Sequence, residues 1–288
     1  MRLLHILIVC GGIVATACAA TTIDPAHPHA YGANLGWMDA QGDVAHGAVL
    51  GQSFCTGSIW SANAGWIDLG QGPTNGWHYN NTAADDWGIN HDGLGHLSGY
   101  AYGANIGWIV FEQTNGQPQI DLWTGNLSGS AWGANVGWIS LSNLQAFVRT
   151  ESLEPGLDTD SDGIPDPWEY RMAGSLSILS GAGHDQDKDG VTDVDEYPAD
   201  TDPLIIASLL TITDYAVASD TNQVTWSVQP SRFYLLEETF SPTNQAIWTD
   251  TGEGLMAPDP GASMTREVMD SGETTQFYRT QAVIPLSP

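Results

Sequence analysis

The sequence predicts a mainly β protein in three parts: an N-terminal repeat of three-stranded meanders, a short calcium-loop segment and a C-terminal immunoglobulin-like β-sandwich. Three observations support this fold class. An aromatic motif recurs four times in the first part, and two acidic stretches of twelve residues form the second. The third part contains short runs in which apolar and polar residues alternate, as they do in strands.

Residues 1–20 have the pattern of a secretory signal peptide. Arg2 precedes an apolar run, and small residues follow up to an expected cleavage after Ala19 or Ala20. An alternative makes Cys18 a lipid-anchored N-terminus, although the leucine usual three residues earlier is missing. No later stretch is long and apolar enough to cross a membrane, so we expect a secreted, extracellular or cell-surface protein without a transmembrane segment.

The overall charge limits the kinds of partner. Lys and Arg number 7 against 34 acids, a formal net charge of −27. A chain this acidic is a poor partner for nucleic acid or for an anionic membrane. Only Cys55 lies beyond the signal region, so no internal disulfide is possible. An exported protein without disulfides needs another constraint, and bound metal is one candidate.

Composition divides the chain after the signal peptide. Residues 21–150 are rich in Trp, Gly and Asn, residues 151–203 hold 15 of the 34 acids, and residues 204–288 return to ordinary β-like sequence. We expect a β-repeat domain, a calcium-binding segment and a β-sandwich with these boundaries.

The first region repeats the pattern aromatic-small-Ala-Asn-x-Gly-Trp. Each copy is predicted to be a three-stranded meander, with strands at 120–123, 127–132 and 138–141 in the last copy. Meanders must close on each other to bury their faces and edges, and a barrel, a prism and a sandwich are all open. The copies are YGANLGW (31–37), WSANAGW (60–66), YGANIGW (102–108) and WGANVGW (132–138).

The longest interval between copies contains an insertion. The motif asparagines are 29, 42 and 30 residues apart, so the 42-residue interval fits one unit plus a loop around residues 70–81.

The motif residues have predicted roles. Asn105 and Asn135 are expected to hold turn conformations that β-branched residues do not adopt. Cys55 aligns with Leu97 and Leu127 and is expected to be a buried thiol. Repetition of the motif tryptophans at fixed positions favours core residues over exposed platforms that stack on sugar rings. These are Trp37, Trp66, Trp108 and Trp138.

The stretches DTDSDGIPDPWE (158–169) and DQDKDGVTDVDE (185–196) share the spacing of a twelve-residue, EF-hand-like calcium loop. Acids occupy positions 1, 3, 5, 9 and 12, glycine occupies position 6, and position 7 offers its backbone carbonyl. A solvated acidic linker is the alternative, but two full matches favour two Ca²⁺ sites. The expected ligands are Asp158, Asp160, Asp162, Ile164, Asp166 and Glu169 in the first loop, and Asp185, Asp187, Asp189, Val191, Asp193 and Glu196 in the second.

The residues on either side of the two acidic loops differ from those of a helix-loop-helix calcium site. Pro155 and Gly156 stand where an entering helix would be. An exit helix is expected after Asp166, ending at Gly174, whereas Pro198 limits the second exit helix to about one turn. Asp200 and Asp202 are weaker candidates for a neighbouring metal site.

The two acidic stretches and the residues after them, DTDSDGIPDPWEYRMAGSL and DQDKDGVTDVDEYPADTDP, resemble thrombospondin type 3 calcium repeats of bacterial exported proteins. The repeated GYAYGANIGWI also resembles an uncharacterised repeat of bacterial secreted proteins. The resemblance implies calcium binding and an extracellular setting, and it implies no known catalysis. The cysteines of animal thrombospondin repeats are absent, so the ions would have to constrain the segment.

The final region reads as short strands with turn signals between them, which predicts the β-sandwich. The candidate strands are 210–217, 223–228, 233–238, 246–251, 264–269 and 276–283.

These patterns predict a calcium-binding structural or adhesive protein of the bacterial cell surface or matrix, with an extracellular glycan or surface protein as a further partner. Protease, P-loop and dinucleotide fingerprints are absent from the sequence, so we expect no enzyme. The adjacent acids Asp85-Asp86 and Glu237-Glu238 do not by themselves form a glycosidase pair. Two alternatives are a carbohydrate-binding module and a polysaccharide-acting enzyme.

Overall fold

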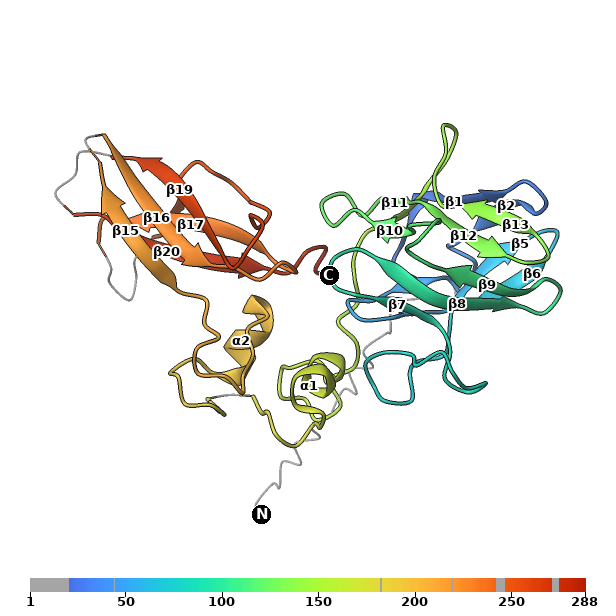
Figure 1. The fold of residues 1–288 in the computed structure, drawn as a ribbon, viewed down its shortest axis with the longest axis horizontal. Helices are drawn as coiled ribbons and strands as arrows, with labels where there is room; N and C mark the ends of the chain where they lie inside the picture. The colour runs from blue at the N-terminus through green and yellow to red at the C-terminus, as the bar shows by residue number, and fades with distance from the viewer. Residues whose placement is uncertain (1–20, 44, 182, 219, 242–246, 271–274) are drawn as a thin grey trace, which may run out of the picture.

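The computed structural model describes residues 21–43, 45–181, 183–218, 220–241, 247–270 and 275–288. They form mainly β structure with two short helices (Figure 1). The predicted signal peptide and the Cys18 alternative fall on residues 1–20, outside the described residues. No helix within the described ranges is long and apolar enough to span a membrane.

Residues from all four repeats close into one antiparallel barrel. The four motif hairpins pair in sequence around the ring, and the last strand pairs with the first through Tyr31 opposite Ser140 and Gly32 opposite Ile139. Among the three architectures that the sequence left open, the barrel is therefore the one formed. Its strands are β1 (Ile23–Gly32), β2 (Gly36–Asp39), β5 (Ser58–Ser61), β6 (Gly65–Asp68), β8 (Leu97–Gly103), β9 (Gly107–Phe111), β12 (Ser130–Gly133) and β13 (Gly137–Ser140).

The third strand of each predicted meander is present but short. The strand expected at 120–123 ends at Ile120, because the Asp121 carboxylate accepts the N–H groups of Trp123 and Thr124 and bends the chain into a turn. The short pairs are β3 (Val49–Leu50) with β4 (Cys55–Thr56), β7 (Ile89–His91) with β8, β10 (Gln119–Ile120) with β11 (Leu127–Ser128), and β14 (Val148–Thr150) with β1.

Strand β14, at the C-terminal end of the barrel region, supplies the third strand of the first repeat. It follows the fourth hairpin in sequence, yet it pairs with the start of β1 through Ile23 opposite Thr150. Both ends of the barrel region are therefore fixed by the same sheet.

The barrel interior is filled by small and large side chains placed opposite each other. Ala101 stands opposite Ile109, and Ala131 stands opposite Ile139, and all four are buried. Pairing a methyl group with a branched side chain suits the limited space inside an eight-stranded barrel.

Cys55 is buried in the same core, as are its repeat counterparts Leu97 and Leu127. Burial raises the pKa of the thiol to about 12. The prediction of a buried structural thiol is confirmed, because a thiol that stays protonated in a core is inert.

The motif turns work differently from the sequence expectation. Asn105 and Asn135 do not have positive φ; the glycine two residues later does, with φ near 78° at Gly107 and Gly137. Glycine adopts this conformation without strain, which frees the asparagine side chain for another contact.

Each motif asparagine joins its turn to the turn of the preceding repeat. Its Nδ2 donates to the backbone carbonyl of the residue before that turn's glycine, and the four bonds form a closed ring around one end of the barrel. The bonds are Asn63 to Leu35 at 2.8 Å, and Asn105 to Ala64, Asn135 to Ile106 and Asn34 to Val136 at 3.0 Å each.

The size of the small residue at the second motif position is matched to the size of the residue between the motif asparagine and glycine. A Cβ on Gly133 would lie 2.5 Å from Val136, and one on Gly103 would lie 2.7 Å from Ile106. The second repeat has the larger Ser61, and there the turn residue is the smaller Ala64. The two positions therefore share one fixed volume.

The acidic region forms two loops, each followed by a helix: α1 (Asp166–Ala173) and α2 (Asp193–Ala199). Helix α1 ends at Gly174, whose φ is 71°, as the sequence predicts. Helix α2 is longer than the single turn expected from Pro198, since this proline lies in its last turn, where it interrupts few hydrogen bonds.

The C-terminal region contains two three-stranded sheets with a shared apolar core that includes Val224, Trp226, Leu236 and Met264. All six predicted strands are present, although the one expected at 246–251 covers only Thr249–Asp250 among its described residues. One sheet contains β15 (Ile212–Val217), β16 (Thr221–Ser227) and β19 (Ser263–Met269), and the other contains β18 (Thr249–Asp250), β17 (Phe233–Thr239) and β20 (Phe277–Val283).

Breaking the asparagine ring should weaken the barrel. Asn34→Ala and Asn135→Ala each remove one side-chain donor, and each should lower the free energy of unfolding by about 1 kcal/mol. Urea unfolding of the mature chain measures this, and similar losses are expected because the two bonds are equivalent. Wild-type stability in both variants would show that the ring contributes nothing.

The matched volumes predict energetic coupling between two turn positions. Gly133→Ser should destabilise the barrel by about 1–3 kcal/mol, because the new Cβ overlaps Val136. Adding Val136→Ala recreates the Ser-Ala combination of the second repeat, so the double variant should lose less stability than the sum of the single variants. Simple additivity in urea unfolding would contradict the shared-volume explanation.

Candidate functional site

Each acidic loop brings three aspartates together. One oxygen from each of Asp158, Asp160 and Asp162 lies within 4.8 Å of the others, and the same holds for Asp185, Asp187 and Asp189. These are positions 1, 3 and 5 of the two predicted loops. At position 6 the chain turns back with φ of 96° in Gly163 and 99° in Gly190, conformations that side chains other than glycine rarely adopt.

Backbone hydrogen bonds shape both loops in the same way. The first aspartate of each loop accepts the N–H of the position-6 glycine at 3.0 Å, and the third accepts the N–H of the next-but-one residue. These bonds use only part of the carboxylate oxygens. Buried oxygens without a hydrogen-bond partner among the described residues remain on Asp162, Asp187 and Asp189.

The position-12 glutamates are buried beside these clusters. Glu169 is 0% exposed, and neither of its carboxylate oxygens has a hydrogen-bond partner among the described residues. Glu196 is 1% exposed; its Oε1 accepts the Thr201 hydroxyl at 2.9 Å, whereas its Oε2 has no such partner. A buried carboxylate without partners is costly in free energy, and a cation bound here would offset that cost.

The electrostatics of the two glutamates point the same way. Burial, followed by the charges of Asp162 and Asp160, raises the pKa of Glu169 to about 8. Burial also raises the pKa of Glu196 to about 7, with Asp189 and Asp187 adding to the effect. A cation held between each glutamate and its aspartates would remove this repulsion and satisfy the free oxygens.

The position-9 aspartates hold the loops closed. Asp166 accepts the backbone N–H of Thr159 at 2.7 Å, and Asp193 accepts that of Gln186 at 2.9 Å. Asp193 also contacts His184 Nδ1 at 2.6 Å. Neither aspartate belongs to the oxygen clusters, which suits a position that often reaches the ion through a water molecule.

A small apolar core joins the two loops. Ile164 at position 7 of the first loop is fully buried with Trp168 and Leu179, and Val194 and Tyr197 of α2 pack against them. The loops therefore form one unit whose core is partly apolar, with Ile164 contributing its side chain to that core.

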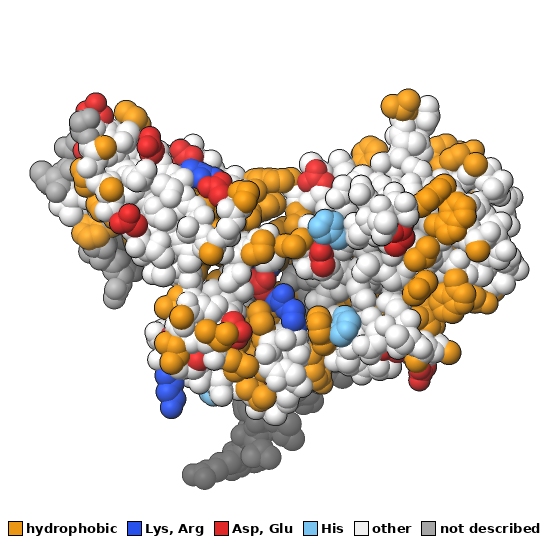
Figure 2. All heavy atoms as spheres, in the orientation of Figure 1, with side chains coloured by type: hydrophobic (Ala, Val, Ile, Leu, Met, Phe, Trp, Pro, Cys, Tyr) orange, Lys and Arg blue, Asp and Glu red, His pale blue; other side chains and the backbone are white. Residues whose placement is uncertain are grey.

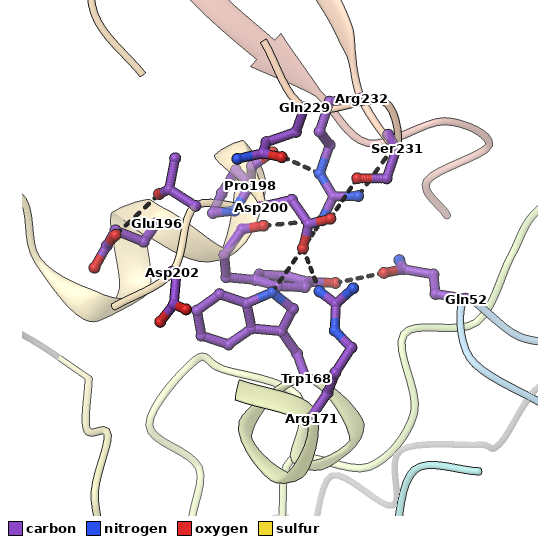
Figure 3. Close-up of polar contacts among 12 residues, drawn as sticks. Gln52, Trp168, Arg171, Glu196, Pro198, Asp200, Asp202, Gln229, Ser231 and Arg232 are labelled. Atoms are coloured by element: carbon purple, nitrogen blue, oxygen red, sulfur yellow. Dashed lines mark hydrogen bonds and ion pairs between the residues drawn. The ribbon is translucent and has the colours of Figure 1, made fainter. Parts of the chain in front are cut away.

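Asp200 links this unit to the rest of the protein (Figure 3). The carboxylate accepts Trp168 Nε1 at 3.0 Å and pairs with Arg171 of α1, and it also accepts the Ser231 hydroxyl. Arg232 lies 3.6 Å away. Asp200 therefore forms a junction of polar contacts in place of the metal ligand considered from the sequence.

The same junction reaches both β regions. Arg232, which directly precedes β17, donates to the carbonyls of Pro198 at 2.8 Å and Tyr197 at 3.0 Å, at the end of α2. The Tyr197 hydroxyl donates to Gln52 of the barrel region at 3.1 Å. Burial acts to raise the pKa of Asp200, but Arg232 and Arg171 outweigh it and keep that pKa below its usual value. The charge pairing that organises the junction has no short-range signal in the sequence.

The motif tryptophans lie on the outer face of the barrel, so the prediction that they are core residues is wrong. Trp37 and Trp108 are the most exposed of the four, at 49% and 48%. Each packs at an interplanar angle of 57–62° against the aromatic residue that opens its motif on the neighbouring strand, with ring centroids 4.9–5.0 Å apart. Figure 2 shows hydrophobic side chains gathered over the barrel strands, on the right of the view.

The adjacent acid pairs do not form a catalytic pair of carboxylates. Asp85 is exposed, whereas Asp86 is buried and accepts hydrogen bonds from Asn80. Burial acts to raise the pKa of Asp86, but its hydrogen bonds outweigh this and lower the pKa. Glu237 pairs with Arg279 at 2.7 Å.

No family model, curated protein or solved structure matches the chain. The interpretation of the acidic segment therefore rests on the geometry of its own residues.

The Asp200 junction should be a strong determinant of stability. Asp200→Asn keeps the shape but leaves Arg232 buried without its counter-charge, and it should cost about 3–5 kcal/mol. Asp259→Asn is the matched control, because Asp259 pairs with Arg266 on the surface, where an ion pair contributes less than about 1 kcal/mol. Chemical unfolding compares them, and equal losses would contradict the central role of Asp200.

Proposed function

We propose that this chain is a secreted calcium-binding protein with a structural or adhesive role at the bacterial cell surface or in the matrix. One observation carries the proposal: Glu169 is buried beside three aspartates, and neither of its oxygens has a hydrogen-bond partner in the described part of the chain. A carboxylate held in this way contributes to stability only when a cation completes its coordination.

The donor set favours Ca²⁺ over other ions. All candidate ligands are oxygens, which excludes sites built for soft transition metals. Each loop carries a formal charge near −5, from five acids in the first loop and six acids with Lys188 in the second. Ca²⁺ accepts six to eight oxygens in a flexible shell, whereas Mg²⁺ needs a tighter octahedron and gives up water reluctantly.

The position of the loops supports a structural role. The two loops and their helices lie between the barrel and the C-terminal sheets (Figure 1). Asp200 connects them to Ser231 of the C-terminal region, and the Tyr197 hydroxyl connects them to Gln52 of the barrel region. Two bound ions would stiffen this connection. Affinities of about 10⁻⁴–10⁻³ M would suffice outside the cell, where calcium is plentiful. The resemblance to thrombospondin type 3 repeats agrees with such a connector. An immunoglobulin-like sandwich as the C-terminal region would agree with it as well.

A second function, carbohydrate binding, is favoured by the outward position of the motif aromatics. Eight rings in four equivalent pairs are exposed on the barrel, and exposed aromatic faces stack on sugar rings.

The calcium proposal predicts opposite effects of one substitution with and without the ion. Glu169→Gln removes a carboxyl group whose ionised form is disfavoured by burial and by the neighbouring aspartates, so without calcium the variant should unfold at a higher temperature than the wild type. With saturating calcium it should unfold at a lower temperature, because one ion is held less tightly. Thermal unfolding in calcium and in chelator measures both effects.

Calorimetry supplies the stoichiometry. The wild type should bind two Ca²⁺ ions, and Glu169→Gln should weaken one of them, whereas the exposed control Glu151→Gln should leave both unchanged. Fewer than one bound calcium per wild-type chain would end the proposal.

A further inference from the structure

The insertion between the second and third repeats folds back onto the barrel as an ordered loop. Residues 70–88 account for the long interval between Asn63 and Asn105. Tyr79 anchors the loop: it is 2% exposed, and its hydroxyl donates to the Cys55 carbonyl at 3.0 Å. Asp86 is buried and accepts Asn80 Nδ2 at 2.7 Å. The loop therefore has a fixed shape against the barrel.

Together with the third repeat, this loop forms an open hollow of about 350 Å³. Asn81, Thr82 and two alanines of the loop form one side, and Trp87, Tyr100 and Trp108 supply the aromatic surface. This size falls within the range of about 300–1,000 Å³ that is usual for small-molecule sites.

The aromatic rings in the hollow hold one another in place. Trp87 meets Trp108 at 87° with ring centroids 5.0 Å apart, and Tyr100 meets Trp108 at 74° with centroids 6.0 Å apart. Because each ring is supported by the edge of another, part of each surface is presented in a fixed orientation. Rigid aromatic surfaces bind flat apolar faces with little loss of entropy.

The third repeat differs from the other three, which act as internal references. All four repeats have the exposed motif pair, but only the third has the inserted loop with Trp87 beside it. Two residues before the motif, the third repeat has Tyr100, whereas the others have His29, Ser58 and Ser130. The additional tyrosine and tryptophan therefore gather at a single repeat.

The lining of the hollow favours a neutral ligand over a ligand that requires an ion pair. No charged side chain is among its lining residues. Arg149 is the single Lys or Arg in residues 21–150, and it pairs with Asp24. An anionic ligand would meet a chain of net charge −27 without a counter-charge, and a cationic ligand would find no carboxylate in the lining.

We propose that this hollow is a binding site for a neutral saccharide, with a pyranose ring stacked on the exposed aromatic surface of Trp87 and Trp108. A pyranose has an apolar C–H face and a rim of hydroxyls, and these fit an aromatic wall beside the hydroxyl of Thr82. The inference rests on the second proposed function and is independent of calcium, since the hollow contains no residue of the acidic segment.

Calorimetric titration of the mature chain with neutral oligosaccharides tests the site. The probes are cellohexaose, xylohexaose, mannohexaose and a galacto-oligosaccharide, with polygalacturonate and tetramethylammonium as charged comparisons. At least one neutral probe should bind, equally in calcium and in chelator. Trp87→Ala and Trp108→Ala should each lower its affinity by about tenfold or more.

A matched variant separates this site from the rest of the aromatic surface. Trp138→Ala removes the equivalent motif tryptophan of the fourth repeat, outside the hollow, and should leave affinity unchanged. Ala84→Trp, at an exposed loop position that lines the hollow, should block binding without removing any ring of the barrel. This variant keeps the test decisive if the tryptophan deletions fail to fold.

The remaining outcomes all overturn the proposal, and they do so in different ways. Equal losses in Trp138→Ala and Trp108→Ala would mean that sugars bind the whole aromatic surface, which keeps carbohydrate binding but rejects the single site. Binding of only tetramethylammonium or polygalacturonate would assign a charged ligand to the hollow. Absence of binding to every neutral probe would reject both the site and the second proposed function, while leaving the calcium proposal to its own measurements.

Discussion

Closure of the eight-stranded sheet is the constraint on which the rest of the barrel depends. Once β13 pairs with β1, every barrel strand has one face directed into a narrow interior and one face directed outward. Side chains alternate along a strand, so a buried Ile139 places Trp138 outside. The interior accepts alanine opposite isoleucine, and the larger aromatic rings lie on the surface in pairs.

The asparagine ring shows how a repeated motif stabilises a closed barrel. A turn that satisfied its own hydrogen bonds would stabilise one hairpin, whereas each asparagine here bonds to its neighbour's turn. The ring of four hydrogen bonds is complete only when Asn34 of the first repeat donates to Val136 of the fourth. The inserted loop then breaks the equivalence of the four repeats, and it does so beside the third aromatic pair. The four similar repeats form the barrel, and the inserted loop beside the third repeat forms the candidate binding site.

The acidic segment combines two opposing tendencies. Its carboxylates repel one another, and burial of Glu169 and Glu196 strengthens that repulsion. Its small apolar core and the Asp200 junction nevertheless hold it between the two β regions. The proposed cation in each loop would resolve this conflict, and the same ions would then stabilise the connection between the barrel and the C-terminal sheets.

By itself, the sequence determined the features that depend on local spacing. The period of two predicted the strands, the motif predicted the hairpin turns, and the loop spacing predicted the aspartate clusters, because each depends on residues close together in the chain. Only the tertiary structure decided which sheet face is inside, because the motif strands carry apolar side chains on both faces, with Trp138 on one and Ile139 on the other. The narrow interior of the closed barrel accepts the smaller set. The tertiary structure also decided that Asp200 pairs with two arginines and that Trp87 lies against Trp108. These contacts depend on how segments distant in the chain pack together, and local sequence patterns do not predict that packing.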